Sequence, residues 1–540
     1  MPAMPESKGK FKKQLKVKDL IYKHQQYIKN EAEWTFVMAL YEGIKEIKRL
    51  GLILQHEREP KVSYGRRIDE LFSLGYSKSI VEIFHFFLFK KQAVKTLGTL
   101  HENKLWGLFN NDADLYGNTL DTSIMEIALY AGIQGHMGVL VDKAQGDFKT
   151  KGEAIDAKVY PYIAKYFPKA ILDWKYDKKE SSRPYLSYLK LLDDNGQYRI
   201  WTEETWEIWE LPKNSNGEPD SSNEEKDGVF IGSGGNPIGI IPFVWHYNQK
   251  SRYLGIGNSD IHEVARIDLS IIRNMSQIEE IVYFAAFPMM RKPMRDASPI
   301  EINAPQQDDE VSVKQVLEFD PEKPESKPDW LVSEVESPVR AALSVVERKV
   351  SEIYRAANIG GMAATEPTKN AQSGVAKIID FQLLNSKLVS KAINLETTEN
   401  KIMEFWLRWE NLWEQYKETV KISRNRTYDI ENIAADLENS LTAKTLVISD
   451  TFNKLLQKQA VRQILPTATE KQLVDIDEEI DENVDNPPDP FGEDLFEDED
   501  EETKGIIDKG MEAEKKGKKV FPFKKGKKVF PFDKSEKEEE

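Results

Sequence analysis

Apolar residues in the middle of the chain recur with the three-to-four spacing of an amphipathic helix. The first such pattern follows the turn Gly257-Asn258-Ser259-Asp260, which also offers a candidate helix cap, and runs from Ile261 to Ile281. Pro288 marks its expected end, because proline cannot continue a helix. The sequence therefore predicts one helix that extends from this turn to about residue 284.

A second helical pattern is predicted to return alongside the first. Ser337-Pro338 starts it, because serine caps helices and proline fits the first helical turn, where its missing N–H costs nothing. Its apolar residues step by four and three positions from Val339 to Ala357, a narrow stripe that suits packing along another helix. Between the two helices, residues 288–336 contain seven prolines and short β-favouring pieces. The sequence thus predicts a helical hairpin with a small strand-containing module at its end.

A loop then separates the hairpin from a very long helix. Gly360, Gly361 and Pro367 are expected to break the second helix. From Ser373 to about Tyr416 nothing breaks the helical pattern again. At about 1.5 Å per residue, such a helix has a length of about 65 Å, which is more than a compact domain needs.

The N-terminal half changes from helical to β character at about residue 135. Residues 19–150 are mostly helical in pattern, with an amphipathic stretch at 31–50. Residues 158–250 are β-rich, and an Asn-Gly turn at 193–196 between two alternating segments predicts a β-hairpin. The most apolar run, 83–89, is too short to span a bilayer. It predicts a buried helix or strand, with a membrane or partner contact as the alternative.

The C-terminal part combines short elements with a tail of biased composition. Residues 419–423 and 444–448 are strand-like, and helices are predicted within 450–474. Beyond about residue 481 the composition cannot support a core, so disorder is expected. The tail repeats the nine-residue segment 515–523 at 524–532, with Val-Phe-Pro-Phe in each copy. Bivalent docking of the two copies and a tandem duplication without function are both open interpretations.

Charge is distributed unevenly along the chain. The formal net charge of −16 arises mainly in residues 475–502, which hold sixteen acidic and no basic residues, whereas 503–540 hold twelve lysines and eight acidic residues. Residues 1–474 therefore carry a net charge of only −4. They lack the broad basic surface that tight binding of duplex DNA demands. The first eighteen residues hold six lysines, which indicates a solvated arm, with a nucleic-acid or scaffold contact as the alternative.

The sequence offers no pattern of catalytic or ligand-binding residues. There is no cysteine, and the seven histidines are scattered without metal-ligand spacing. The glycines of 232–236 lack the Gly-Lys-Ser/Thr of a phosphate-binding loop and predict a turn instead. The spacing of Trp406, Trp409 and Trp413 is typical of a core stripe rather than of a base-stacking platform. The sequence therefore predicts no enzyme activity, no cofactor and no metal.

The order of these patterns resembles the portal proteins of tailed bacteriophages. In that family a helix after a Gly-x-Ser-Asp-like turn leads into a clip, a second stem helix returns, and a tunnel loop ends in a Ser-Gly-Val-Ala sequence that begins a long helix. This chain has Gly257-Asn258-Ser259-Asp260, the clip-like 285–336 and Ser373-Gly374-Val375-Ala376 in that order. The resemblance covers roughly residues 30–480 and is strongest in 236–416.

The resemblance implies an α+β subunit with the portal fold, which assembles into a ring of about twelve copies. It divides the chain into a disordered basic arm (1–18), a wing (19–256), stem helix 1 (257–284), a clip (285–336), stem helix 2 (337–358), a tunnel loop (359–372), a long helix with a return to the wing (373–449), crown helices (450–480) and a disordered tail (481–540).

The resemblance also implies which residues act. The tunnel loop would face the central channel, where double-stranded DNA passes without sequence-specific binding. Its candidate DNA contacts are Lys369, Asn370 and Gln372, and its candidate hinges are Gly360 and Gly361. The clip would dock external partners, and its candidate anchors are Arg291, Lys292, Arg295 and Trp330. An ordinary surface turn is the alternative for the loop residues.

The implied partners are other copies of the chain, the terminase large subunit, head-completion or adaptor proteins, and the major capsid and scaffolding proteins, with no membrane. The implied location is the unique capsid vertex of the virion, after assembly in the host cytoplasm. Two interpretations from other classes stay open. One is a non-catalytic nucleic-acid-processing factor with a lysine-rich tail. The other is a helical scaffold protein, which would form elongated monomers or dimers.

Overall fold

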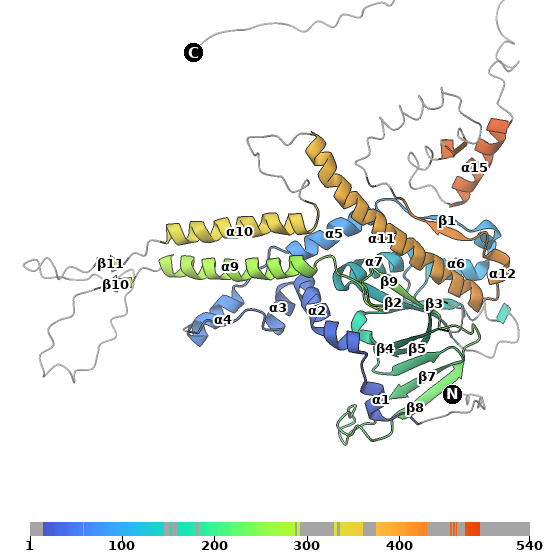
Figure 1. Cartoon of the computed structure of the whole chain (residues 1–540), viewed down its shortest axis with the longest axis horizontal. Helices are drawn as coiled ribbons and strands as arrows, with labels where there is room; N and C mark the ends of the chain where they lie inside the picture. Colours follow the sequence, from blue (N-terminus) through green and yellow to red (C-terminus); the bar gives the residue numbers. More distant parts are fainter. Residues whose placement is uncertain are drawn as a thin grey trace, which may run out of the picture. The chain divides into compact units, whose positions relative to one another are not determined.

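The structure is a computed structural model of the chain. It describes residues 14–57, 59–144, 152–153, 157, 159–178, 183–286, 289–291, 329–331, 335–359, 374–426, 428, 454–455, 457–458, 461 and 470–485. The chain divides into two compact units, residues 1–431 and 432–540. Mixed helices and antiparallel sheets make up the first unit (Figure 1), which confirms the predicted α+β class.

Helices dominate the first 134 residues, as predicted. They are α1 (Val17–Ile21), α2 (Gln25–Glu42), α3 (Ile44–Arg49), α4 (Lys61–Asp69), α5 (Tyr76–Phe89), α6 (Lys104–Asn111) and α7 (Leu120–Gln134), with a short 3-10 helix η1 at Gly98–Glu102. Gly43, with φ of 90°, divides the predicted 31–50 helix into α2 and α3. The apolar run 83–89 lies in α5, where Phe84 and Leu88 are buried. Its interpretation as a buried helix is therefore confirmed for these residues.

The folded part begins before residue 18, where the basic arm was expected to end. Val17 and Leu20 of α1 are fully buried. The Val17 N–H donates to the carbonyl of Lys226 at 2.9 Å, and Lys18 forms an ion pair with Glu225 at 2.6 Å. Apolar burial and these two bonds hold the last residues of the arm against the loop that precedes strand β8, whereas residues 1–13 lie outside the described residues.

Two antiparallel sheets follow α7. The first has the order β3-β2-β9, and the second has the order β4-β5-β6-β7-β8. Their strands are β2 (His136–Lys143), β3 (Pro161–Tyr166), β4 (Ile171–Asp177), β5 (Tyr185–Leu192), β6 (Tyr198–Thr202), β7 (Thr205–Glu210), β8 (Val229–Gly235) and β9 (Phe243–Tyr247), with a 3-10 turn η2 at Pro168–Ala170. The predicted hairpin is β5–β6, in which Leu192 pairs with Tyr198.

One turn prediction in this region is wrong. The glycines at 232, 234 and 235 lie in β8, which pairs only with β7 at the edge of the five-stranded sheet. An edge strand accepts glycine because it has one neighbouring strand to pack against. The turn lies just beyond, where the Asn236 side chain accepts from the N–H of Ile238 at 3.2 Å. Strand β9 begins beyond this turn, at Phe243, and ends within the predicted β-rich stretch 158–250.

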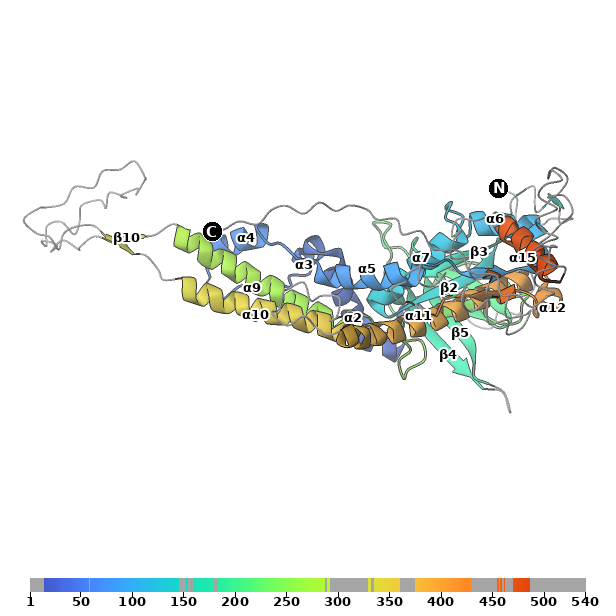
Figure 2. The same ribbon diagram turned by 90° about the horizontal axis from the view of Figure 1, so that it is seen from above.

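The predicted helical hairpin is formed by α9 (His262–Ala286) and α10 (Glu336–Ala356), which lie side by side in Figures 1 and 2. At their far ends, β10 (Met289–Arg291) and β11 (Asp329–Leu331) form a short antiparallel ladder. Helix α10 begins at Glu336, so Ser337 lies inside the first turn and is not its cap. The β-favouring pieces between 311 and 319 lie outside the described residues.

The long helix is α11 (Gly374–Trp409), followed by the one-turn helix α12 (Trp413–Tyr416). The prediction of an unbroken helix to Tyr416 is wrong, because Asn411 adopts a left-handed φ of 56° and ends the run. Strand β12 (Lys421–Ser423) pairs with β1 (Val94–Thr96), so the chain returns to the N-terminal helices after α11. The predicted strand at 444–448 lies outside the described residues.

The first unit contains two hydrophobic clusters that meet at β2. Met137, Val139 and Val141 point into a helical cluster with residues of α5, α7, α9 and α11. Leu140 points the other way, into a cluster with the aromatic residues of the five-stranded sheet. Alternation along a strand sends successive side chains to opposite faces, so β2 is a wall that both cores share.

The second unit is described mainly by α15 (Glu470–Asp485). Lys458 donates to Asp481 at 2.8 Å, which ties the short described piece at 457–458 to this helix. The helix continues past residue 481, where disorder was expected to begin. Most of the region 450–474, where helices were predicted, lies outside the described residues, as does the repeated tail.

Candidate functional site: the anchors of the long helix

The residues predicted to line a channel lie between two described anchor points. Gly360, Gly361, Lys369, Asn370 and Gln372 are outside the described residues. The segment that contains them starts after Ile359, which is 2 % exposed, and ends at Gly374, where α11 begins. Any function of this segment therefore depends on how α10 ends and on how α11 is held.

Helix α10 ends at a left-handed residue that the sequence analysis did not single out. Asn358 has a φ of 61°, and its N–H donates to Arg355 at 3.1 Å. The N–H of Ile359 reaches back to the carbonyl of Tyr354 at 3.0 Å, the bond that closes a Schellman motif. Asparagine tolerates this backbone conformation better than most residues. The helix thus stops before the glycine pair that was expected to break it.

The clip residues are described only in part. Arg291 and Trp330 lie on adjacent rungs of the β10–β11 ladder, because Arg291 pairs with Asp329 and Met290 pairs with Trp330. The backbone therefore brings the two predicted anchors to one end of the hairpin. Lys292 and Arg295 lie outside the described residues.

A buried ion pair joins α11 to the turn that precedes α9. The Asp260 carboxylate and the Lys391 ammonium are 2 % and 9 % exposed and are bonded directly, and Lys391 also donates to the Asn248 side chain. Lys387 lies 3.6 Å from the second Asp260 oxygen. Burial acts to raise the pKa of Asp260, but the two lysines outweigh it and hold the pKa below its usual value. Asp260 is therefore ionised in the folded protein, whereas burial lowers the pKa of Lys391 and the Asp260 charge opposes that change.

The turn that carries Asp260 is packed too closely for a side chain at Gly257. A Cβ there would lie 2.0 Å from the carbonyl oxygen of Gly135, which itself has a φ of 93°. The N–H of Asp260 donates to the carbonyl of Gly132 at 2.9 Å. Ser259 stabilises the turn before α9, since its Oγ accepts from the N–H of Ile261 at 3.1 Å. Asp260, the last residue of this turn, points at α11.

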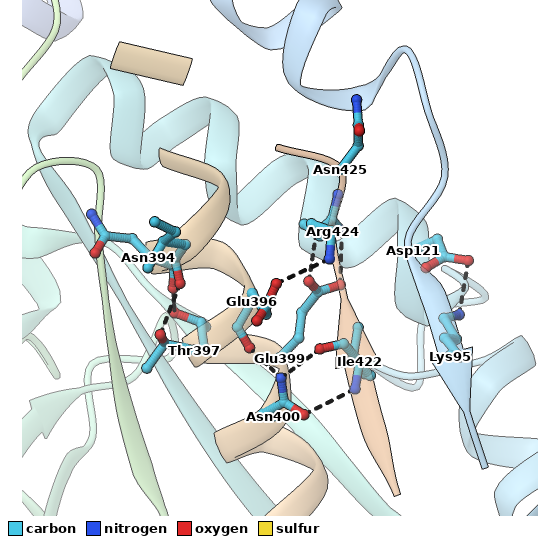
Figure 3. A network of polar contacts seen from close by, with 12 residues as sticks. Lys95, Asp121, Asn394, Glu396, Thr397, Glu399, Asn400, Ile422, Arg424 and Asn425 are labelled. Carbon is cyan, nitrogen blue, oxygen red and sulfur yellow. Dashed lines mark hydrogen bonds and ion pairs between the residues drawn. The ribbon is translucent and has the colours of Figure 1, made fainter. Parts of the chain in front are cut away.

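A second buried ion pair anchors α11 eight residues further along (Figure 3). The Arg424 guanidinium donates to both oxygens of Glu399 at 2.5 and 2.7 Å, and both side chains are at most 5 % exposed. Asn400 makes two bonds to the backbone of Ile422, accepting at 2.9 Å and donating at 2.8 Å. Glu396 accepts from the N–H of Arg424 at 3.1 Å. The chain after β12 is therefore fixed along one face of α11.

The tryptophans of α11 pack in the core, as predicted. Trp406 is fully buried and lies edge-on to Trp106, with ring centroids 5.6 Å apart. The indole N–H of Trp409 donates to the carbonyl of Val141 at 2.8 Å. Trp413 is half-buried in α12, beyond the end of α11, and stacks under the Arg408 guanidinium at 5.0 Å. Trp406 and Trp409 therefore pack the C-terminal end of α11 against the core beside β2.

Neither ion pair was predicted from the sequence, although the sequence contains a signal for both. The buried apolar residues of α11 are spaced as one stripe: Leu384, Leu388, Leu395, Ile402 and Trp406. Lys391 and Glu399 occupy the positions where this stripe would place further apolar residues. A charge on an apolar stripe indicates a buried partner, because an unpaired buried charge is very costly.

The two fully buried histidines lie close to these anchors. The His246 Nδ1 is 2.9 Å from the hydroxyl of Thr398 on α11, and the His136 ring lies tilted against Trp245, with ring centroids 5.5 Å apart. Burial lowers the pKa of each to about 3. In the part of the chain that the structure describes, no group of His, Asp or Glu side chains could hold a metal ion. None of the described helices is long and apolar enough to cross a membrane.

Comparison of the whole chain with protein-family models and with curated proteins finds no match.

Proposed function

We propose that this chain is a portal protein of a tailed bacteriophage, which forms a ring at one capsid vertex and serves as the conduit for DNA packaging and ejection. One observation carries the proposal. The antiparallel pair α9–α10 ends in the β10–β11 ladder, and the chain then passes through residues 360–373 into α11, which returns to the sheet-bearing part of the unit. This is the order of stem, clip, stem, tunnel loop and long helix expected from the resemblance.

The charge of the hairpin supports a conduit. Helices α9 and α10 together hold seven acidic and six basic residues, so neither a strongly positive nor a strongly negative wall is present on them. DNA that must move through a channel should not be held by many phosphate contacts, since each adds to the salt-dependent affinity. A nearly neutral stem meets this requirement.

The anchors of α11 support a role for the segment 360–373 as a tunnel loop. On one side Ile359 is buried, and on the other side α11 is fixed by two ion pairs. We propose that this segment moves against passing DNA while Ile359 before it and α11 after it stay in place. In this proposal Lys369 makes transient phosphate contacts, Asn370 and Gln372 offer uncharged hydrogen bonds, and Gly360 and Gly361 are hinges.

The remaining parts take the roles that follow from the portal assignment. Arg291, Lys292, Arg295 and Trp330 of the clip dock terminase during packaging, and later the head-completion or adaptor proteins. Residues 450–480 form the crown, and the capsid and scaffolding proteins contact the outside of the ring. The protein acts in the virion after assembly in the host cytoplasm.

Negative-stain electron microscopy of the purified full-length chain tests this proposal. Closed rings with a central hole are expected. Elongated monomers or dimers at micromolar concentration would contradict it and would favour a helical scaffold protein. A Lys369→Ala variant sharpens the test, because it is expected to form the same rings while packaging less DNA than the parent protein. A Lys104→Ala variant removes an exposed lysine on α6, outside the proposed channel loop, and is the matched control.

A further inference from the structure

Helix α4 and the loops beside it present an unusually apolar surface. Four large apolar side chains are exposed there. They are Leu54, Val62, Phe72 and Leu74, with 68 %, 86 %, 37 % and 47 % of their surface accessible. Soluble monomers seldom leave this many large apolar residues exposed within one short segment. The surface is therefore a candidate contact face.

The surface also contains a recess. A cavity of about 190 Å³ lies between α3 and α4. Its lining is apolar apart from Lys48 and Asp69, and consists of Ile47, Lys48, Gly51, Ile53, Tyr64, Gly65, Ile68 and Asp69. Gly65 lies one turn from Val62 on the outer side of α4, and nothing lies within 4 Å of where its Cβ would be. The recess can therefore take a small apolar side chain from outside. Asp69 stands at its edge and Glu70 follows, both exposed.

This surface is fixed to the hairpin by α4. The Arg67 guanidinium, which is 4 % exposed, bonds Glu59 at 2.7 Å and the Ser276 hydroxyl of α9 at 3.2 Å. Arg66 pairs with Glu280 of α9 at 2.8 Å. The recess is thus held at the level of residues 276–280 along the hairpin.

Helix α10 exposes a complementary stripe. Pro338, Ala341, Val345 and Arg348 are exposed and follow one another at spacings of three and four residues, so they share one helix face. Val345 is 48 % exposed, whereas its neighbour Val346 is buried on the α9 side. The stripe offers one apolar side chain, flanked by a small residue and by a positive charge.

The stripe and the recess lie at the same level of the hairpin but on opposite sides. Lys349 of α10 donates to Ser270 of α9 at 2.8 Å. Because the helices are antiparallel, Val345 lies one turn further toward the β10–β11 end, within a turn of Ser276. In both views α9 lies between α4 and α10 (Figures 1 and 2). A rotation about an axis parallel to the hairpin leaves each residue's position along that axis unchanged. The stripe of one copy can therefore meet the recess of a neighbouring copy that is related by such a rotation.

We propose that the α3–α4 recess docks helix α10 of a second copy of this chain, with Val345 in the recess and Arg348 against Asp69 and Glu70. The interface joins two different faces, so it is heterologous and closes into a ring when the rotation allows. Opposite charges at its edge select the register. The inference rests on the proposed ring and names the stem contact that builds it.

Cross-linking of engineered cysteines tests the contact, because the natural chain contains no cysteine. A full-length Val62→Cys/Val345→Cys variant treated with a short bismaleimide is expected to give a ladder of covalent oligomers that ends at the complete ring. The control is Tyr116→Cys/Val345→Cys, since Tyr116 is 89 % exposed but lies outside both faces. The control is expected to stay monomeric in a denaturing gel.

The outcomes separate this inference from the proposed function. Rings in the microscope without a ladder would overturn the α4–α10 contact and leave the portal proposal standing. Absence of both rings and ladder would contradict the contact and count against the portal proposal as well. A ladder no stronger than that of the control would also overturn the contact.

A charge reversal gives a second readout that does not depend on cysteine geometry. Arg348→Glu is expected to weaken assembly by about tenfold, because it places like charges at the edge of the recess. Adding Asp69→Arg in the same chain is expected to restore assembly. Equal assembly by the parent, the single variant and the double variant would contradict the assigned register.

Discussion

The hairpin and the long helix are held to the same unit by different means. Helices α9 and α10 meet through apolar side chains such as Val346 and Ile353, and the ion pairs along α10 are exposed. Helix α11 has an apolar stripe too, but charged residues interrupt it at Lys391 and Glu399, and each has a buried partner. The hairpin is packed and hydrogen-bonded, through Lys349 to Ser270 and through the buried Asp268 to Ser77, whereas the long helix is packed and held by pairs of buried opposite charges.

The difference indicates which part can adjust and which part cannot. Apolar contacts are non-directional, so two helices that meet through them can shift slightly at small cost. A buried ion pair tolerates little displacement, because a buried charge that loses its partner is strongly destabilised. We therefore interpret α11 as the fixed element and the hairpin as the adjustable one. Variants that remove each kind of contact test this comparison.

The largest effect is expected from removing one member of a buried pair. Asp260→Ala leaves Lys391 buried without its carboxylate and is expected to lower the free energy of unfolding by about 3–5 kcal/mol. Urea unfolding followed by tryptophan fluorescence measures this loss. The double variant Asp260→Asn/Lys391→Met removes both charges and is expected to recover most of it. A loss below about 1 kcal/mol in the single variant would show that the pair does not anchor α11.

A smaller loss is expected from the hairpin. Ile353→Ala removes a fully buried side chain of α10 and is expected to cost about 2–4 kcal/mol in the same unfolding experiment. Leu343→Ala is the matched control, because that side chain is 40 % exposed and its removal should cost less than about 1 kcal/mol. Equal losses for the two variants would contradict the packed interface between α9 and α10.

Acid is expected to destabilise the packing around the long helix α11 at a higher pH than it destabilises the hairpin. His136 and His246 have a pKa of about 3 when folded, whereas an exposed histidine has a pKa of about 6.5. The unfolded chain therefore binds more protons between these values, and stability falls as the pH drops below 6.5. From pH 7 to pH 5 each histidine is expected to cost about 2 kcal/mol.

The pH effect can be assigned to one residue. His246→Asn is expected to remove about half of the loss between pH 7 and pH 5, measured by urea unfolding at each pH. The carboxylate of Asp260 stays charged throughout this range, since its pKa is held below the usual value. Helices α9 and α10 contain a single histidine, the exposed His262, so the hairpin has no buried histidine to protonate. An unchanged pH dependence in the variant would contradict the assignment.

The smallest effect is expected at the end of α10. Asn358→Ala replaces asparagine by a residue that tolerates the left-handed backbone less well. It is expected to lower the free energy of unfolding by about 1 kcal/mol. Asn358→Gly should cost less than the alanine variant, because glycine adopts this conformation freely. Thermal unfolding of the two variants compares them directly. A glycine variant less stable than the alanine variant would argue against the Schellman motif as the stop of the helix.

Periodic patterns predicted the elements of this fold better than their ends. The sequence predicted the helical hairpin α9–α10 and the β-hairpin β5–β6, because their apolar spacing and turn residues are typical of these structures. The end of α11 was missed because Trp409 and Trp413 continue the apolar spacing across Asn411, where only the backbone changes. Helices α9 and α10 begin at His262 and Glu336, so neither Ser259 nor Ser337 is the cap of its helix, although local capping rules favour serine near these starts.

The anchors could not be read from local rules, because each partner lies far away along the chain. Asp260 was a candidate cap by its position, and its actual partner Lys391 follows 131 residues later. Glu399 and Arg424 belong to a helix and to the residue after a short strand, and neither element predicts the other. Interrupted apolar stripes indicate that such partners exist, but only the fold identifies them. The proposed loop contacts Lys369, Asn370 and Gln372 stay predictions.

Native mass spectrometry of the full-length chain tests the central claim most directly, because it counts the copies in each assembly. The portal account predicts one dominant species of twelve or thirteen chains for the parent protein. The Asp260→Ala variant is expected to assemble poorly, and the Asp260→Asn/Lys391→Met variant is expected to assemble well. A spectrum of monomers and dimers at all concentrations would contradict the account.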